Sequence, residues 1–300
     1  MNTPSNAVPE TPATMSPTRP LYWSIRRELW ENRSIYIAPL VVAAVFLLAV
    51  LISIVHLPER RRATLLLDPA HQQAAIEKPY DIAAILLILT AFLVGVFYCL
   101  DALHGERRDR SILFWKSLPV SDLTTVLSKA SIPLVVLPLI TFAIVFATQL
   151  IMTLSSSAVL TANGLSGGTW TPLSQGSLVL LYGLAALALW HAPIYGWLLL
   201  VSGWARRTVF LWAVLPPLVL CIVERITLGT SHFGSLVMKR LMGFAPGAFD
   251  FNLHHSIAID SLTQLTPGRY LSTPGLWIGL VVAAAFLAVA VRLRHYRGPI

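Results

Sequence analysis

Residues 35–55, IYIAPLVVAAVFLLAVLISIV, contain no charged side chain and decide the fold class of this chain. An α-helix rises about 1.5 Å per residue, so this stretch is long enough to cross a hydrocarbon core of about 30 Å. Strands of outer-membrane barrels alternate apolar and polar residues, and this solid apolar block does not. The stretch therefore predicts a transmembrane α-helix.

Five further apolar runs follow along the chain, which gives six predicted spans. The chain of 300 residues is 56% hydrophobic and 12% charged, whereas a soluble domain carries about 25% charged residues. We expect an all-α membrane protein whose spans lie at about residues 35–55, 82–100, 132–152, 178–201, 209–226 and 276–291. Pro216 and Pro217 interrupt the fifth run. Two consecutive prolines remove two backbone donors, so we expect a kink or a break there.

The N-terminal part of the chain divides into a polar tail and an amphipathic segment. Residues 1–18 are rich in Pro, Thr and Ser, which favours a disordered cytoplasmic tail; residues 19–300 form the six-span domain. In residues 21–33, LYWSIRRELWENR, apolar residues recur at helical spacing beside charged ones. Trp23, Arg26, Arg27 and Trp30 suit the membrane interface, so we expect an interfacial helix before the first span. The alternative is that this segment extends the first span as one helix.

The positive charges are distributed unequally between the two sides of the predicted bundle. If the N-terminus is cytoplasmic, the inner segments carry 14 of the 22 Lys and Arg residues and the outer segments carry 8. Cytoplasmic loops of membrane proteins are enriched in Lys and Arg, so both termini are expected inside, although the cluster at residues 60–62 opposes this orientation. We expect a multi-pass protein of the inner (cytoplasmic) membrane. This sidedness explains the net charge of +8 without a nucleic-acid partner.

The connection between the second and third spans, HGERRDRSILFWKSLPVSDLTTVLSK at residues 104–129, has an ordered pattern. A charged cluster at residues 106–110 leads into an apolar run at 112–115. Pro119 ends that run, and Ser121 is placed to cap a following helix. This order predicts a short amphipathic helix along the cytoplasmic surface. The alternative is an ordinary basic loop whose arginines meet anionic lipid.

This connection resembles the first cytoplasmic loop of the permease subunits of type-2 ABC exporters. The opening Glu106-Arg107, the step Leu118-Pro119-Val120-Ser121 and the returning Lys129 match the pattern of that family. The family often has Lys-Gly-Thr after the glutamate, whereas this chain has residues Asp109-Arg110-Ser111. The resemblance extends to the interfacial helix, the six spans and the long segment before the last span. It implies a coupling helix that docks on an ATPase through Glu106, Arg107, Arg108, Asp109, Arg110, Ser111, Phe114, Trp115, Leu118 and Pro119.

The same resemblance implies that transport and ATP hydrolysis belong to different chains. The sequence contains no GxxxxGK[ST] phosphate loop, so a separate P-loop ATPase, in two copies, would bind ATP and Mg and hydrolyse the nucleotide. This chain would be a transport subunit without a cofactor of its own, and it would form the substrate pathway with a second copy or a homologue. The alternative function is a membrane-embedded enzyme or sensor that uses the long outer connection at residues 227–273.

Two further groups of residues outside the loop are of interest. Glu224 and Arg225 lie at the outer end of the fifth span, where a charge is costly unless it is paired or hydrated. Together with Pro216 and Pro217 they are candidates for lining a pathway or exit. No metal site is expected, because the histidines at 232, 254 and 255 have no HExxH pattern and no nearby cysteine.

Overall fold

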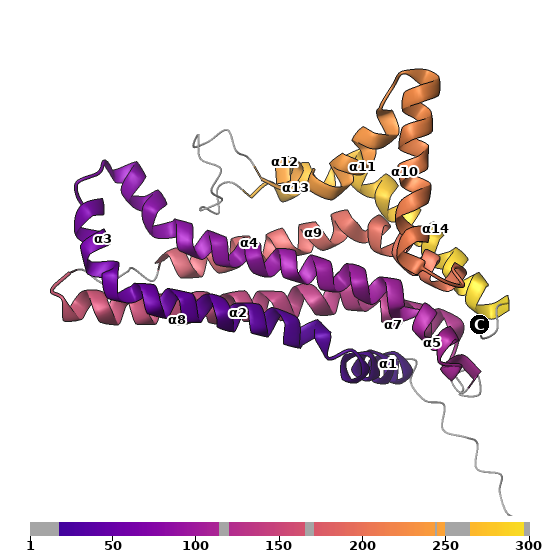
Figure 1. Ribbon diagram of the computed structural model, residues 1–300, viewed down its shortest axis with the longest axis horizontal. Coiled ribbons are helices and arrows are strands. Elements are labelled where there is room, and N and C mark those ends of the chain that lie inside the picture. Colours follow the sequence, from indigo (N-terminus) through magenta and orange to yellow (C-terminus); the bar gives the residue numbers. More distant parts are fainter. Residues whose placement is uncertain (1–17, 114–119, 166–170, 244, 250–264, 297–300) are drawn as a thin grey trace, which may run out of the picture.

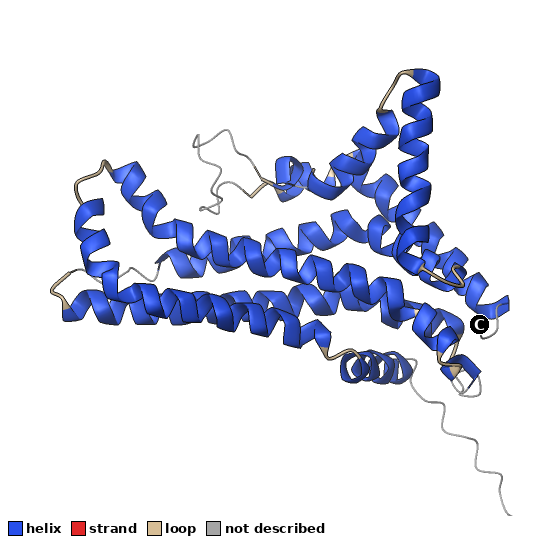
Figure 2. Cartoon of the chain, in the orientation of Figure 1, coloured by secondary structure: helices blue, strands red, loops and turns tan. Residues whose placement is uncertain are grey.

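The computed structural model describes residues 18–113, 120–165, 171–243, 245–249 and 265–296. Regular structure in these residues is helical (Figures 1 and 2), and one isolated β-bridge pairs Phe249 with Leu265. The predicted all-α class is therefore confirmed. The elements are α1 (Thr18–Glu31), α2 (Ser34–Ser53), η1 (Ile54–His56), α3 (Leu57–Thr64), α4 (Pro69–Ala102), α5 (His104–Arg108), α7 (Asp122–Ser131), η2 (Ile132–Val136), α8 (Leu137–Ala162), α9 (Thr171–Trp204), α10 (Val209–Leu228), α11 (His232–Met242), α12 (Ala245–Ala248), α13 (Pro267–Leu271) and α14 (Pro274–Tyr296).

Six helical segments among the described residues are long and apolar enough to cross a membrane, as the sequence predicts. They contain α2, α4, α8, α9, α10 and α14, and an even number of spans places both ends of the bundle on one side. We call this the terminal side and the opposite side the far side. α4 and α9 have 34 residues each, about 51 Å, and exceed a hydrocarbon core of about 30 Å. Most of the first far-side connection is therefore helix, in α3 and the beginning of α4.

Helix α1 is separate from the first span. It ends at Glu31, α2 begins at Ser34, and Figure 1 shows α1 nearly end-on while α2 lies along the bundle. The alternative of one continuous first helix is therefore wrong. Trp23 and Trp30 are exposed, and the guanidinium of Arg26 lies 5.2 Å and 4.9 Å from their ring centroids. This aromatic and cationic face suits the membrane interface.

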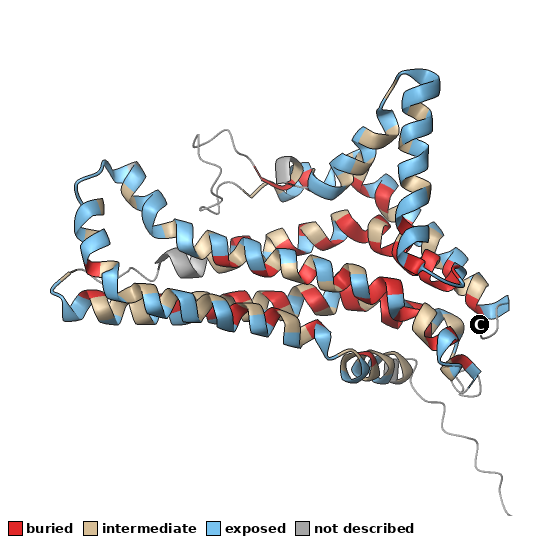
Figure 3. Cartoon of the chain, viewed as in Figure 1, coloured by how far each residue is buried: buried red, intermediate tan, exposed pale blue. Residues whose placement is uncertain are grey.

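The closest packing in the bundle joins α9 to α14. A Cβ atom at Gly196 would lie 3.2 Å from the carbonyl oxygen of Ala283, so the absence of a side chain lets the two backbones approach. The largest apolar cluster lies nearby and includes Cys99, Tyr195 and Leu199. Figure 3 shows buried residues concentrated in α9 and in the terminal-side parts of α4 and α7. The core therefore supports the terminal side of the bundle.

Helix α10 continues through Pro216 and Pro217. Of the two predicted alternatives, the break is therefore wrong, and the kink stays a prediction. A proline at 217 cannot donate to the carbonyl four residues earlier, which belongs to Ala213. The indole N–H of Trp197 donates to this carbonyl at 3.0 Å, and this hydrogen bond satisfies the group that the proline leaves unpaired. In Figure 1, α10 points away from the other spans, and its buried residues are Val209 and Ala213, near its first turn.

Candidate functional site

Six charged side chains meet at the terminal side of the bundle. They come from four elements that are distant in sequence: Arg27 and Glu28 on α1, Glu106 on α5, Asp122 and Lys129 on α7, and Arg294 on α14. We call them the charge cluster. Three carboxylates face three cations, so the cluster is formally neutral.

Glu106 is the centre of the charge cluster. Its Oε1 atom accepts from Arg27 Nη2 at 3.0 Å and lies 3.1 Å from Lys129 Nζ, and its Oε2 atom accepts from Arg294. The Glu106 side chain is 7% exposed and those of Lys129 and Arg294 are 3% and 4% exposed. Such charges are stable away from water because each is paired and hydrogen-bonded.

Glu28 provides the second carboxylate of the charge cluster. Its Oε1 atom accepts from Lys129 Nζ at 2.9 Å and from Arg27 at 3.0 Å, and its Oε2 atom accepts from the hydroxyl of Tyr98 at 2.9 Å. Arg27 also lies 3.3 Å from Glu31 at the edge of the charge cluster. Burial raises the pKa of Glu31, and the positive charge of Arg27 opposes this shift.

The last span joins the charge cluster through Arg294. Its Nε atom donates to Asp122 Oδ1 at 3.0 Å, while Nη1 donates to Glu106. Asp122 is in the first turn of α7, where a negative charge also interacts favourably with the helix dipole. The charge cluster thus fastens α1, α5, α7 and α14 to one another, and through them the first, second, third and sixth spans.

Arg107 fastens the same region to the fourth span. Its Nη1 atom donates to the carbonyl oxygens of Gly203 at 2.8 Å and Ala205 at 3.2 Å. The carbonyls at the end of a helix have no intrahelical donor, so Arg107 caps α9. In return, Ser202 Oγ accepts from the backbone N–H groups of Leu103 and His104 at 3.0 Å and 2.9 Å. These contacts set the turn between α4 and α5.

The exposed part of the loop begins immediately after these buried residues. Arg108, Asp109, Arg110 and Leu113 are exposed, and Ser111 is half-buried. Arg110 has a φ of 57°, a left-handed conformation that reverses the chain between α5 and the next turn. We call Arg108, Asp109, Arg110, Ser111 and Leu113 the exposed tip; Ile112 between them is buried. Phe114, Trp115, Leu118 and Pro119 lie outside the described residues. On the return side, Ser121 caps α7 by accepting from Thr124 N at 3.1 Å, as predicted.

Two of the predicted docking residues are internal. Glu106 and Arg107 are buried and hold the bundle together, and their role in coupling to a partner stays a prediction. Their side chains turn toward neighbouring spans, whereas Arg108 on the same short helix is exposed. Arg27 likewise turns inward from the interfacial helix, whereas Trp23, Arg26 and Trp30 face outward.

The candidate pathway residues on α10 have structural roles on the far side. Glu224 accepts from the backbone N–H groups of His232 at 2.6 Å and Phe233 at 2.8 Å, and from the hydroxyl of Thr230 at 2.9 Å. It therefore caps the beginning of α11, where unpaired N–H groups and the helix dipole favour a carboxylate. Arg225 is exposed. None of the predicted exit residues lines the crevice described below.

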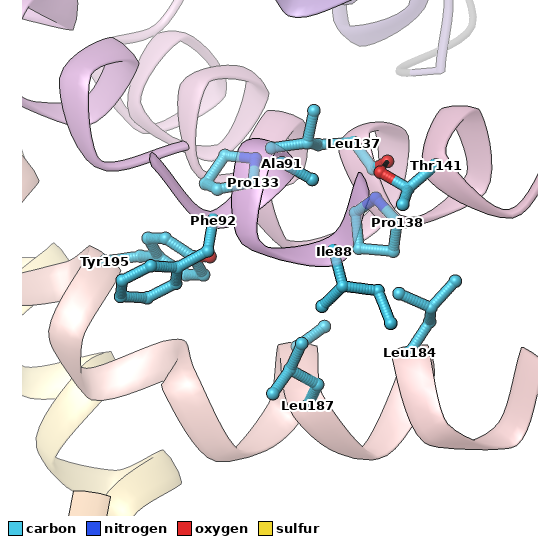
Figure 4. Close-up of a pocket in the computed structure, with 11 residues that line it drawn as sticks. Ile88, Ala91, Phe92, Pro133, Leu137, Pro138, Thr141, Leu184, Leu187 and Tyr195 are labelled. Atoms are coloured by element: carbon cyan, nitrogen blue, oxygen red, sulfur yellow. Dashed lines mark hydrogen bonds between the residues drawn. The ribbon is translucent and has the colours of Figure 1, made fainter. Parts of the chain in front are cut away.

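An apolar crevice lies between α4, the junction of η2 with α8, and α9 (Figure 4). Its cavity has a volume of about 20 Å³, room for about one water molecule. Phe92, Pro133, Thr141, Leu184 and Tyr195 are among its lining residues. The π-helix η2 includes Pro133, and single π turns interrupt the regular hydrogen-bond ladder of a span. The crevice marks a loosely filled seam in the bundle.

No protein-family model, curated protein or solved structure matches this chain. The charge cluster, the exposed tip and the crevice therefore carry the functional argument. Their membrane setting follows from the six apolar helices.

Proposed function

We propose that this chain is the membrane-spanning permease subunit of an ATP-driven exporter. The exposed tip and the residues that follow it would dock on a separate ATP-hydrolysing subunit in the cytoplasm. The resemblance of residues 106–129 to the coupling loop of type-2 ABC exporters motivates the proposal. The observation that supports it best is the charge cluster directly behind the exposed tip.

The charge cluster gives the exposed tip a rigid support. Glu106 lies two residues before Arg108 and is bonded to α1, α7 and α14, while Arg107 is bonded to the end of α9. A partner that pushes or pulls on the exposed tip therefore acts on five spans together instead of bending a loose loop. Rigid-body rocking of packed helices is the common way in which such a displacement reaches a pathway.

The nucleotide chemistry belongs to the partner in this proposal. Two ATPase subunits would hold ATP and Mg, and this chain would convert their movement into opening and closing of a path across the membrane. A second copy of the chain, or a homologue, would complete the path. The exposed apolar surface of α10, including Phe210, Leu218 and Ile222, provides area for that contact as well as for lipid.

The proposal is tested by reversing charges on the exposed tip. We expect Arg108→Glu combined with Arg110→Glu to reduce the amount of P-loop ATPase that co-purifies with the chain at least about tenfold, because charged contacts at an interface set partner recognition. The matched control is Arg206→Glu with Arg207→Glu, two exposed arginines in the connection between α9 and α10 on the same side. If both double variants retain the ATPase equally, the exposed tip is not its docking site.

A further inference from the structure

Arg240, on the far side of the molecule, lies between two spans. It belongs to α11, and its guanidinium lies 4.4 Å from the ring centroid of Trp190 on α9. Its Nη2 atom donates to the carbonyl oxygen of Gly275 on α14 at 2.7 Å. The indole N–H of Trp190 donates to the carbonyl of Lys239 at 3.1 Å. The end of α11 is thus fixed against α9 and α14.

Gly279 provides the space for this arginine. A Cβ atom at Gly279 would overlap the Arg240 guanidinium, whereas a Cβ at Gly275 would approach Thr273 and Trp190 only at 3.8 Å and 3.9 Å. The guanidinium therefore lies against the bare backbone of α14, and even an alanine at 279 would displace it. A side chain held by stacking, a hydrogen bond and a glycine-shaped space is pre-organised for a ligand.

The site lies within the far half of the membrane. Trp190 precedes the end of α9 at Trp204 by 14 residues (204 − 190), about 21 Å along the helix. Gly279 precedes Arg294 of the charge cluster by 15 residues (294 − 279), about 22 Å. Counted from an edge of the hydrocarbon core at Trp204 and Arg294, both estimates place Arg240 about two thirds of the way across a core of about 30 Å.

The positive charge at this depth has no carboxylate partner among the described residues. Arg240 is half-buried, and the neighbouring Lys239 adds a second, exposed cation. The nearby Tyr270 does not neutralise them: burial raises its pKa to about 12, and its hydroxyl donates to the carbonyl of Ala186 at 2.7 Å. A charged side chain within a membrane is costly unless an opposite charge or water meets it.

A guanidinium is suited to one class of ligand in this setting. It presents five N–H groups in a planar fork that matches a phosphate in a bidentate manner. Among the described residues, Gly275 receives the one hydrogen bond that this guanidinium donates, so further N–H groups remain for an anion. The ring of Trp190, with its centroid 4.4 Å away, holds the guanidinium in place. The apolar surfaces of α9 and α14 on either side suit acyl chains.

We propose that Arg240, with Trp190 and Gly279, forms a binding site for the phosphate group of an anionic amphiphile in the far leaflet. The headgroup would accept hydrogen bonds from Arg240 and interact with the charge of Lys239. Its acyl chains would lie along α9 and α14. This site is independent of the exposed tip and of any ATPase.

The test is lipid binding by the full chain after delipidation in detergent. Phosphatidylglycerol, phosphatidylcholine and inorganic phosphate are titrated separately, and bound molecules are counted by native mass spectrometry. We expect wild type to retain phosphatidylglycerol and Arg240→Gln to weaken this binding on the order of tenfold, because charge-assisted hydrogen bonds are lost. Gly279→Ala, which displaces the guanidinium without removing charge, should weaken it similarly, whereas Gly275→Ala should bind like wild type.

Three outcomes would overturn the proposal. Equal binding of phosphatidylglycerol by wild type and Arg240→Gln would exclude Arg240 as its ligand. An equal loss in Gly275→Ala would show that any disturbance of this contact releases lipid. Inorganic phosphate that binds wild type at the concentrations of phosphatidylglycerol, but not Arg240→Gln, would assign the site to a free anion. If Gly279→Ala loses its folded elution peak, the comparison of Arg240→Gln with Gly275→Ala still shows whether Arg240 binds phosphatidylglycerol.

Discussion

Replacing Glu106 by Gln removes the central negative charge of the charge cluster and preserves the size of the side chain. In the wild type this carboxylate meets Arg27 at 3.0 Å, Lys129 at 3.1 Å and Arg294. The variant would leave these three cations with the carboxylates of Glu28 and Asp122 in the charge cluster, and with Glu31 beside Arg27 at its edge. The Lys129 and Arg294 side chains are 3% and 4% exposed, so water cannot replace the lost partner.

The expected cost follows from that burial. Removing one partner of a buried ion pair destabilises a protein by about 3–5 kcal/mol, because an uncompensated charge stays buried. A loss of 1 kcal/mol lowers the melting temperature by about 2–4 °C in domains of 150–250 residues. At the lower sensitivity expected for a chain of 300 residues, Glu106→Gln should melt about 6–10 °C below wild type.

The assay is thermal unfolding of the purified chain in detergent, followed by intrinsic fluorescence. Glu31→Gln is the matched control: its side chain is 51% exposed and lies 3.3 Å from Arg27, and such surface pairs contribute about 1 kcal/mol or less. The double variant Glu106→Gln with Lys129→Met removes one charge of each sign. Its loss in free energy of unfolding should be smaller than the sum of the losses in the two single variants. A Glu106→Gln variant as stable as Glu31→Gln, or strictly additive costs in the double variant, would refute the role of the charge cluster.

Three other substitutions test separate contacts by the same unfolding assay. Arg107→Met should lower the free energy of unfolding by about 1.5–3 kcal/mol, because the charged hydrogen bonds to the end of α9 are lost. The control Arg108→Met, at an exposed position, should lower it little. Equal effects of the two variants would contradict the capping role of Arg107. Trp197→Phe should cost about 1–3 kcal/mol, because it leaves the carbonyl of Ala213 unpaired beside the prolines of α10; an unchanged melting temperature would contradict that account. Ser121→Ala should cost about 1 kcal/mol as a lost N-cap, and a neutral result would show that α7 begins without it.

The spans were predictable because a membrane helix needs a long apolar run and little else. The sequence-based spans end within a few residues of α2 and α10, and at the terminal side they end within three residues of α4 and α9. The sixth predicted span begins within two residues of α14 and ends five residues before it. The far-side extensions were missed because polar residues such as those at 69–81 continue a helix after it leaves the hydrocarbon. The continuity of α10 was missed because it depends on a hydrogen bond from Trp197, a residue in another span.

The site was predictable in position and only partly in its members. The pattern at residues 104–129 located the connection that contains Glu106 of the charge cluster, and Ser121 caps α7 as expected. Arg294 was missed as a partner of Glu106, and Glu28 was missed as a partner of Lys129 and Arg27. Each is one charge near the end of a helix, and its contacts depend on how α1 and α14 pack. A sequence pattern also does not state which face of the short α5 turns inward, so the burial of Glu106 and Arg107 was not predicted.

The most direct test of the proposed function is the mass of the intact assembly. The full chain, purified in mild detergent from membranes that express it at natural levels, is analysed by native mass spectrometry with identification of each component. The account predicts a complex with two P-loop ATPase subunits and two membrane-spanning subunits, at least one of them this chain. A chain that is recovered at full yield, alone or with partners that lack an ATP-binding subunit, would contradict it.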